Sequence, residues 1–523
     1  MRKALAAGLL FSAAALAQIG AIQGERIRPH VKILSSDLFE GRGVGQRGGA
    51  LAVEYIESQF AAAGLKPGAA DGTYRQRVPL KLIAMEGSPV LTMSIGAQKV
   101  ELKWLDEFVG HSQRQQPSVA VDAEMIFAGH GISAPEFGWD DYAGTDVKGK
   151  AVVLFTNEPP SDDTKFFGGR ALTYYGRWTY KYEEATRRGA AAVLIVHTDA
   201  TAGYGYQVVK ANGRPQPQVG RAEGAYALGF AGWITQGSAE RLFAMTGNTV
   251  EAMLAKANTK GFKPIPLGMR MKLDLVNKVD DVETYNVVGR IDGSDPESSK
   301  EAVVYTAHWD HLGVGDPVNG DTIYNGALDN ATGCAMLIEM ARAWASMEPK
   351  PRRSVLFAAV TAEESGLLGS AYLAQNPPVP AAKLAADLNF DSFSPLGRAK
   401  SSVMTGADRT SFFGVVQAAA ARHQLAIEKE GNPGAGGYFR SDHFSFAKQG
   451  VPAFSVGMGA RAAAQLPGAL NAVSERMKGI YHQPSDQYYD DWDFSGLEQF
   501  ARFGMALGLD IANLPELPAR IKP

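Results

Sequence analysis

The sequence predicts an α/β fold, with a mixed central β-sheet, helices on both of its faces and an inserted β-rich domain. Apolar strand-like runs alternate with helical patterns from residue 285 to 510, which is typical of a sheet covered by helices. Short strand-like runs separated by glycine-rich loops fill residues 118–273. The chain of 523 residues also exceeds the size at which one core usually divides.

Residues 1–17 have the pattern of a signal peptide. Positive charge after Met1 precedes an apolar run at 4–16, and the small residues Ala15 and Ala17 form a cleavage pattern. The run is shorter than the roughly 20 apolar residues that span a bilayer. We therefore expect an exported mature chain, periplasmic or secreted, without a membrane span.

Residues 18–117 are predicted to be the N-terminal part of the main domain. A helical pattern extends over 23–65 with a break at 38–43, and Gly64 ends it. Alternating and β-branched runs between 74 and 105 predict strands.

Residues 118–273 are predicted to be the inserted domain, and residues 274–523 complete the main domain. The expected elements of the insert are strands at 119–127, 150–155 and 191–197 and a helix at 181–188.

Charge and cysteine content exclude several functions. The chain has 52 Lys and Arg residues against 55 Asp and Glu residues and no basic run, so we expect no nucleic-acid partner. Its one cysteine, Cys334, cannot form an intrachain disulfide or a thiolate zinc site by itself. Any metal would therefore be bound by His, Asp and Glu.

Three predicted strands end in side chains that can bind metals, and sheet-based enzymes place their ligands at this end of the strands. The apolar run 302–307 precedes His308, Asp310 and His311, the run 354–361 precedes Glu363 and Glu364, and the run 384–390 precedes Asp391. Asp329 lies just before a predicted helix, and His482 follows late in the chain.

Each feature alone has an ordinary structural explanation. Paired glutamates usually lie on a solvated surface, and a single histidine is more often a hydrogen-bonded structural residue than a ligand. Here four of the nine histidines lie in Gly- and Asp-rich turns, namely His308, His311, His443 and His482. This combination predicts a metal site.

The motifs resemble those of the zinc peptidase family that contains bacterial leucyl aminopeptidases and glutamate carboxypeptidase II. The matching segments are HWDHLG (308–313), GALDNATG (326–333), EESGLLG (363–369), NFD (389–391), SDH (441–443) and HQPSD (482–486). The N-terminal segments SSDLFEGR (35–42) and AAGLKP (62–67) also resemble this family. Within the insert, GHGISAPEFGWDDY (129–142) and ATRRGAAAV (185–193) resemble a protease-associated domain.

The resemblance implies two zinc ions bridged by Asp329. His308 and Asp391 would complete one zinc site, and Glu364 and His482 the other. The mixed imidazole and carboxylate set suits zinc. A water or hydroxide bridging the two ions would be the nucleophile, because zinc lowers the pKa of water to about 7.

The resemblance also implies roles for three further residues. Glu363 would be the general base that takes a proton from the bridging water. Asp310 would orient the imidazole of His308. Tyr438 would stabilise the oxyanion, although Gly437 and Phe439 replace the disulfide that some relatives have beside this tyrosine.

We therefore expect a zinc-dependent exopeptidase that hydrolyses the N-terminal bond of peptides. A carboxypeptidase or dipeptidase of the same family is the alternative, but the arginine cluster that binds acidic substrates in carboxypeptidase-like relatives is not recognised here. A glutaminyl cyclase-like transferase and a non-catalytic receptor-like binding protein are two further alternatives. The presence of all five predicted zinc ligands beside Glu363 argues against both the transferase and the binding protein.

Overall fold

The computed structural model describes residues 13–521 except 203–204, 211–212, 223 and 460–467. Most of the predicted signal peptide, residues 1–12, lies outside the described residues. The chain divides into two compact units. Unit 1 comprises Met1–Val78, Glu283–Glu430 and Arg440–Pro523, and unit 2 comprises Pro79–Val282 and Gly431–Phe439.

Unit 1 contains a mixed sheet with the strand order β1-β15-β19-β16-β20-β23-β21-β22. The central strands β19, β16, β20 and β23 are parallel, whereas β15 and β21 pair antiparallel with their neighbours β19 and β23. The strands are β1 (Lys66–Pro67), β2 (Arg75–Arg77), β15 (Tyr285–Ile291), β16 (Ala302–His308), β19 (Ser354–Val360), β20 (Leu384–Phe390), β21 (Ser401–Thr405), β22 (Ala426–Glu428) and β23 (Ala453–Met458).

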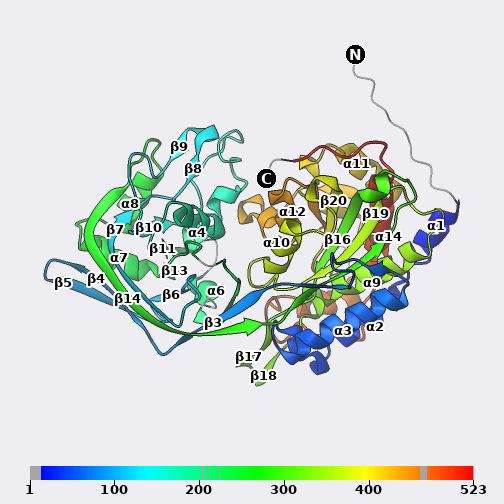
Figure 1. Ribbon diagram of the computed structural model, residues 1–523, viewed down its shortest axis with the longest axis horizontal. Coiled ribbons are helices and arrows are strands. Elements are labelled where there is room, and N and C mark those ends of the chain that lie inside the picture. Colours follow the sequence, from blue (N-terminus) through cyan, green and yellow to red (C-terminus); the bar gives the residue numbers. More distant parts are fainter. Residues whose placement is uncertain (1–12, 203–204, 211–212, 223, 460–467, 522–523) are drawn as a thin grey trace, which may run out of the picture. The chain divides into compact units, whose positions relative to one another are not determined.

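Helices cover this sheet on both faces (Figure 1). On one face, α9 (Thr332–Ala345) and α14 (Ser495–Ala512) contact each other and the strands β16 and β20. The other face carries α10 (Leu368–Gln375) and α12 (His443–Lys448). Every residue of β16, β19 and β20 is buried, as expected for parallel strands covered on both faces. The predicted fold class is confirmed.

The N-terminal helical pattern forms two helices separated by a turn. α2 (Gly24–Leu34) and α3 (Arg47–Ala62) flank the short helix η1 (Asp37–Arg42). Positive φ angles at Glu40, Gly41 and Arg42 interrupt the helical path. Unit 1 also contains the helices α1 (Ala13–Gly20), α11 (Phe413–Arg422) and α13 (Gly468–Arg476).

Unit 2 is built on a second mixed sheet, with the strand order β12-β3-β14-β7-β10-β11-β13-β6. The long strand β14 (Ile265–Val282) pairs with three antiparallel neighbours, and its residues alternate between buried and exposed. The other strands are β3 (Leu80–Glu86), β4 (Val90–Ile95), β5 (Gln98–Lys103), β6 (Phe108–His111), β7 (Ser118–Phe127), β10 (Ala151–Phe155), β11 (Ala192–Val196), β12 (Gln216–Val219) and β13 (Phe230–Ile234).

The helices of unit 2 include α4 (Trp178–Arg187), α7 (Gln236–Ala244) and α8 (Val250–Ala257). The unit begins at Pro79, whereas the predicted insert begins at residue 118. Strands β3 and β4 hydrogen-bond to β14 and therefore lie in the sheet of this unit. The assignment of 118–273 as a protease-associated domain stays a prediction. None of the helices in the described part of the chain has the length and apolar character that a membrane span requires.

Candidate metal centre

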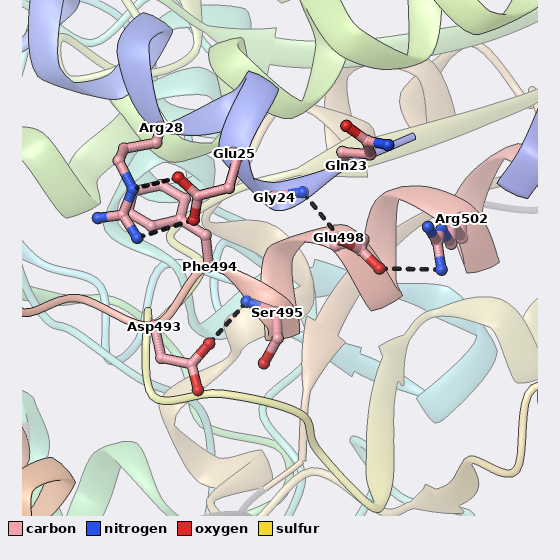
Figure 2. Close-up of a pocket in the computed structure, with 9 residues that line it drawn as sticks. All are labelled: Gln23, Gly24, Glu25, Arg28, Asp493, Phe494, Ser495, Glu498 and Arg502. Carbon is pink, nitrogen blue, oxygen red and sulfur yellow. Dashed lines mark hydrogen bonds and ion pairs between the residues drawn. The ribbon is translucent and has the colours of Figure 1, made fainter. Parts of the chain in front are cut away.

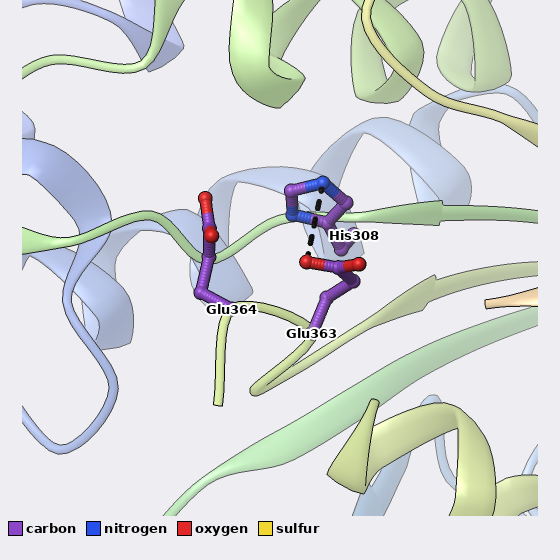
Figure 3. A group of neighbouring side chains, drawn as sticks. All are labelled: His308, Glu363 and Glu364. Atoms are coloured by element: carbon purple, nitrogen blue, oxygen red, sulfur yellow. Dashed lines mark ion pairs between the residues drawn. The ribbon is translucent and has the colours of Figure 1, made fainter. Parts of the chain in front are cut away.

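Three neighbouring strands of unit 1 bring metal-binding side chains to one edge of the sheet. β16 lies between β19 and β20 and is parallel to both, so their carboxyl ends coincide. His308 is the last residue of β16 and pairs with Val360, the last residue of β19. Figure 3 shows His308 facing Glu363 and Glu364, which follow β19.

His308 is surrounded by carboxylates. Its side chain is 1% exposed, so these groups interact away from water. The distances from His308 Nε2 are 3.2 Å to Asp329 Oδ1, 3.4 Å to Asp391 Oδ1 and 4.0 Å to Glu363 Oε2. The nearest of the three carboxylates is therefore that of Asp329, whose Oδ1 faces this histidine.

His482 approaches the same aspartate from the other side. His482 Nε2 lies 2.8 Å from Glu364 Oε2 and 3.5 Å from Asp329 Oδ2. Asp329 thus presents Oδ1 to His308 and Oδ2 to His482. The structure brings together all five predicted ligands, which are His308, Asp329, Glu364, Asp391 and His482.

The loop that carries Asp329 is fixed by main-chain contacts. Asp486 accepts hydrogen bonds from the backbone N–H groups of Leu328 and Asp329, at 2.8 Å and 3.0 Å. Gly326 has a φ of 59°, and a Cβ atom there would lie 2.2 Å from the Asp329 carbonyl oxygen and 2.5 Å from the His311 ring. A glycine is therefore required at this position.

Asp310 follows His308 by two residues and is completely buried. The main-chain oxygen of Asp310 is 3.0 Å from His308 Nδ1, whereas its carboxylate Oδ1 is 3.9 Å from that nitrogen. The same Oδ1 accepts a hydrogen bond from the backbone N–H of Glu363 at 3.1 Å. Asp310 therefore contacts both the histidine and the glutamate segment, and its orienting role stays a prediction.

The two histidines are strongly basic. Burial by itself lowers the pKa of His308, but Glu363 and Asp391 outweigh burial and raise this pKa well above its usual value. Burial also opposes the charge of His482, but Asp329 and Glu364 raise its pKa to about 10. The centre therefore favours positive charge at the positions between its carboxylates.

The pKa values of two carboxylates of the centre, Glu363 and Asp329, are shifted in opposite directions. Burial raises the pKa of Glu363 well above its usual value, and neighbouring Glu364 adds to this effect. For Asp329 burial acts in the same direction, but hydrogen bonds from His308 and His482 hold its pKa well below the usual value. Glu363 therefore accepts a proton more readily than Asp329.

The donor set fits divalent zinc. Three overlapping groups of ligand atoms lie close enough to share a cation, namely His308–Glu363–Glu364, His308–Asp329–Asp391 and His311–Asp329–Glu364. Imidazole and carboxylate donors in a buried, carboxylate-rich centre match the ligands that zinc takes in proteins. His311 enters this set although the sequence analysis gave it no role.

Tyr438, the predicted oxyanion donor, lies in the segment Gly431–Phe439, which clusters with unit 2. Its ring packs edge-on against Phe439 at 5.2 Å. The backbone N–H of Leu172 donates a hydrogen bond to the Pro433 carbonyl oxygen at 3.0 Å. A loop of unit 2 therefore contacts the segment that carries Tyr438, whose role stays a prediction.

Tyr481 contacts the centre, although no role was predicted for it. Its ring stacks on the His482 ring, with a centroid distance of 3.8 Å and an interplanar angle of 20°. The residue is nevertheless 71% exposed, so its other side is accessible. Its position directly before a predicted ligand was the signal in the sequence.

A pocket of about 400 Å³ in unit 1 includes none of these residues. It lies where α2 and α14 begin (Figure 2). Its charged side chains pair with one another, since Arg28 Nε lies 3.1 Å from Glu25 and Arg502 lies 2.9 Å from Glu498.

The fold and the cluster define a class of protein, an α/β protein with a buried histidine–carboxylate centre at the carboxyl ends of parallel strands. Residues 286–505 match the sequence model of Peptidase family M28. The family resemblance inferred from the motifs is confirmed.

Curated relatives match shorter segments. A probable zinc metalloprotease of Pyrenophora tritici-repentis is 40% identical over 90 residues, which are 17% of this chain and 18% of that protein. Aminopeptidase NAALADL1 of Rattus norvegicus is 33% identical over 118 residues, 21% of this chain and 14% of that protein. The chain thus spans less than a fifth of the length of these two relatives.

A solved structure is similar in fold over nearly the whole chain. The aminopeptidase from Aneurinibacillus sp. strain AM-1 has a TM-score of 0.53 and 20% sequence identity, with 97% of this chain and 98% of that chain covered. This likeness agrees with the predicted α/β class.

Proposed function

We propose that this protein is a zinc-dependent aminopeptidase that hydrolyses the N-terminal bond of peptides with two bound zinc ions. The observation that carries the proposal is the position of Asp329 between two histidines, with one oxygen 3.2 Å from His308 and the other 3.5 Å from His482. A carboxylate in this position suits a bridge between two cations.

The two metal sites would share Asp329. His308 and Asp391 would complete one site, and Glu364 and His482 would complete the other. Bound zinc would polarise the scissile carbonyl and increase the acidity of water at neutral pH.

Glu363 is the best candidate for the general base. Its carboxylate is the most distant of the three that face His308, which suits a group that does not bind the metal. Its pKa is raised by burial and by Glu364, so it can take a proton from water and later pass this proton to the leaving amine.

Recognition of a free N-terminus is supported by the names of similar proteins. Two of the similar proteins described above are named aminopeptidases. This observation supports an aminopeptidase over a carboxypeptidase.

Two tyrosines are candidates for stabilising the oxyanion. Tyr438 is the candidate that the family resemblance implies. Tyr481 is a second candidate, because it stacks on His482 and has a phenol that can donate a hydrogen bond. Separate substitutions of each tyrosine by phenylalanine, with kcat and KM measured, would distinguish them, since loss of an oxyanion donor lowers kcat.

A substrate panel tests the proposed function. Zinc-loaded protein is offered aminoacyl p-nitroanilides, their N-acetylated forms, C-terminally amidated peptides and peptides that begin with glutamine. Cleavage of free but not acetylated N-termini, with amidated peptides also cleaved, is expected. Cleavage that needs a free C-terminus would indicate a carboxypeptidase, cyclisation without hydrolysis would indicate a transferase, and binding without turnover would indicate a receptor-like protein.

We also propose that the mature chain begins near Gln18 and is exported, and that residues 118–273 form a protease-associated domain. The signal-peptide pattern supports the first proposal. N-terminal sequencing of the protein recovered outside the cytoplasm tests it, and a chain that retains Met1 there would contradict it.

A further inference from the structure

Arg42 ends the SSDLFEGR motif, to which the proposed function assigns no role. The residue lies at the end of η1, with a φ of 50°. Its side chain is 1% exposed, although arginine is rarely buried without a partner. Because buried polar groups are normally hydrogen-bonded, the five guanidinium N–H groups need acceptors inside the protein.

All five N–H groups of Arg42 donate to main-chain carbonyl oxygens. A guanidinium has five donors in a fixed planar arrangement, and here none is left over. Nε donates to Trp309 at 2.7 Å, Nη1 to Leu34 at 2.6 Å and to Asn325 at 2.7 Å, and Nη2 to Gly326 at 2.8 Å and to Asp329 at 3.4 Å. Among the described residues no ion pair with a carboxylate is seen for this guanidinium.

These carbonyls belong to the segments that carry the proposed ligands. Trp309 directly follows His308, so the Nε bond fixes the end of β16. Asn325 and Gly326 begin the loop that leads to Asp329, whose own carbonyl takes the last donor. The N–H of Asp329 is held by Asp486. The backbone of Asp329 is therefore restrained on both sides.

The main chain of Arg42 contributes as well. Its carbonyl oxygen accepts a hydrogen bond from the backbone N–H of His311 at 3.3 Å, and the next residue, Gly43, forms a β-bridge with His311. One arginine thus connects the N-terminal helices, the end of β16 and the loop that contains Asp329.

We infer that Arg42 is a positioning residue of the metal centre, which fixes His308 and Asp329 through main-chain carbonyls and places a permanent positive charge behind the carboxylates. This inference rests on the proposed function. Lysine would supply the charge but only three donors from one nitrogen. A lysine at this position would therefore leave carbonyls of the ligand loop without their donors.

The test compares Arg42→Lys and Arg42→Met with matched substitutions of Arg353. Arg353 is also 1% exposed and lies in unit 1, and it binds Glu301 and the carbonyl of Leu514 rather than the ligand segments. Folding is measured by circular dichroism and thermal unfolding. Zinc affinity is measured by competition with a chromophoric chelator, and the absorption spectrum of the cobalt-substituted protein reports the geometry of the ligands.

We expect Arg42→Lys to fold, to bind zinc at least about tenfold more weakly than wild type and to show an altered cobalt spectrum. Arg353→Lys should keep the affinity and spectrum of wild type, even if its thermal stability falls. Folded Arg42 variants with wild-type affinity and spectrum would overturn the inference. Failure of both Arg42 variants to fold would also overturn it, because Arg42 would then be needed for the fold. Wild-type protein that binds no zinc would overturn the proposed function itself, and the inference with it.

Discussion

His311 Nδ1 lies 2.7 Å from Glu364 Oε1, and the other oxygen of this carboxylate faces His482 Nε2 at 2.8 Å. An ionised carboxylate only accepts hydrogen bonds, so Nδ1 of His311 is the donor. The contact leaves Glu364 Oε2 directed to the proposed metal site. Outer contacts of this kind orient metal ligands and tune metal affinity.

The first prediction concerns this contact. His311→Leu removes the donor and should weaken zinc binding about 10- to 100-fold, whereas His311→Asn places an amide near the position of Nδ1 and should lose less. Chelator competition measures both affinities. Equal zinc affinities for the two variants and wild type would show that His311 does not orient Glu364.

A second prediction concerns Asp486, which is 1% exposed and accepts the N–H groups of Leu328 and Asp329. Asp486→Ala leaves two buried donors without acceptors and should lower the free energy of unfolding by about 3 kcal/mol. Urea denaturation measures this change. Asp295→Ala is the control, since Asp295 accepts two similar bonds from Glu297 and Ser298 outside the centre. Asp486→Ala should also bind zinc more weakly, because Asp486 holds the backbone of the loop that carries Asp329, whereas Asp295→Ala should keep the zinc affinity of wild type. An equal loss of zinc affinity in both variants would contradict the prediction.

The third prediction concerns Gly326, where a Cβ atom would meet the Asp329 carbonyl and the His311 ring. Gly326→Ala should reduce zinc affinity because the ligand loop must move. Gly320→Ala provides the control: this glycine also has a positive φ, of 89°, but no atom lies within 4 Å of an added Cβ. The control carries only the backbone strain of about 1–2 kcal/mol. Wild-type zinc binding by Gly326→Ala would show that the loop tolerates the displacement.

The fourth prediction concerns pH and His130 in unit 2, which is 1% exposed and lies 2.8 Å from Asn258 Oδ1. Burial lowers the pKa of His130 from 6.5 to about 4. Between these values the unfolded chain binds a proton that the folded chain does not, so stability falls as the pH falls from 6.5 towards 4.

Between about pH 7 and pH 5 this one group should remove about 2 kcal/mol from the free energy of unfolding. Urea denaturation of wild type and His130→Asn at both pH values isolates the effect, because the variant lacks the titrating group. A loss of stability as large in the variant as in wild type would assign the pH dependence to other groups.

The candidate ligands could be predicted because their sequence context is local. Continuous apolar runs end at His308 and just before Glu363 and Asp391, and parallel strands present their carboxyl ends at one edge. The structure places these side chains together, with His308 Nε2 3.4 Å from Asp391. The strands and the fold class followed from the same periodicity.

Other parts of the centre could not be predicted, because they depend on long-range contacts. Arg42 lies more than 260 positions from the carbonyl of Trp309, and no periodic pattern marks a side chain that donates only to main-chain oxygens. The same limit applies to β3, whose pairing with β14 joins segments far apart in the sequence.

The most direct test of the proposed mechanism is zinc content measured together with turnover of an aminoacyl p-nitroanilide, for wild type, Glu363→Gln and Glu339→Gln. Glu339 is a buried glutamate of α9 that pairs with Arg342, and it serves as the matched control. We predict near two zinc ions per chain in all three proteins, with turnover lost by at least about 100-fold only in Glu363→Gln. Wild-type turnover by zinc-loaded Glu363→Gln would contradict the assigned base, and an absence of zinc in active wild type would contradict the metal centre.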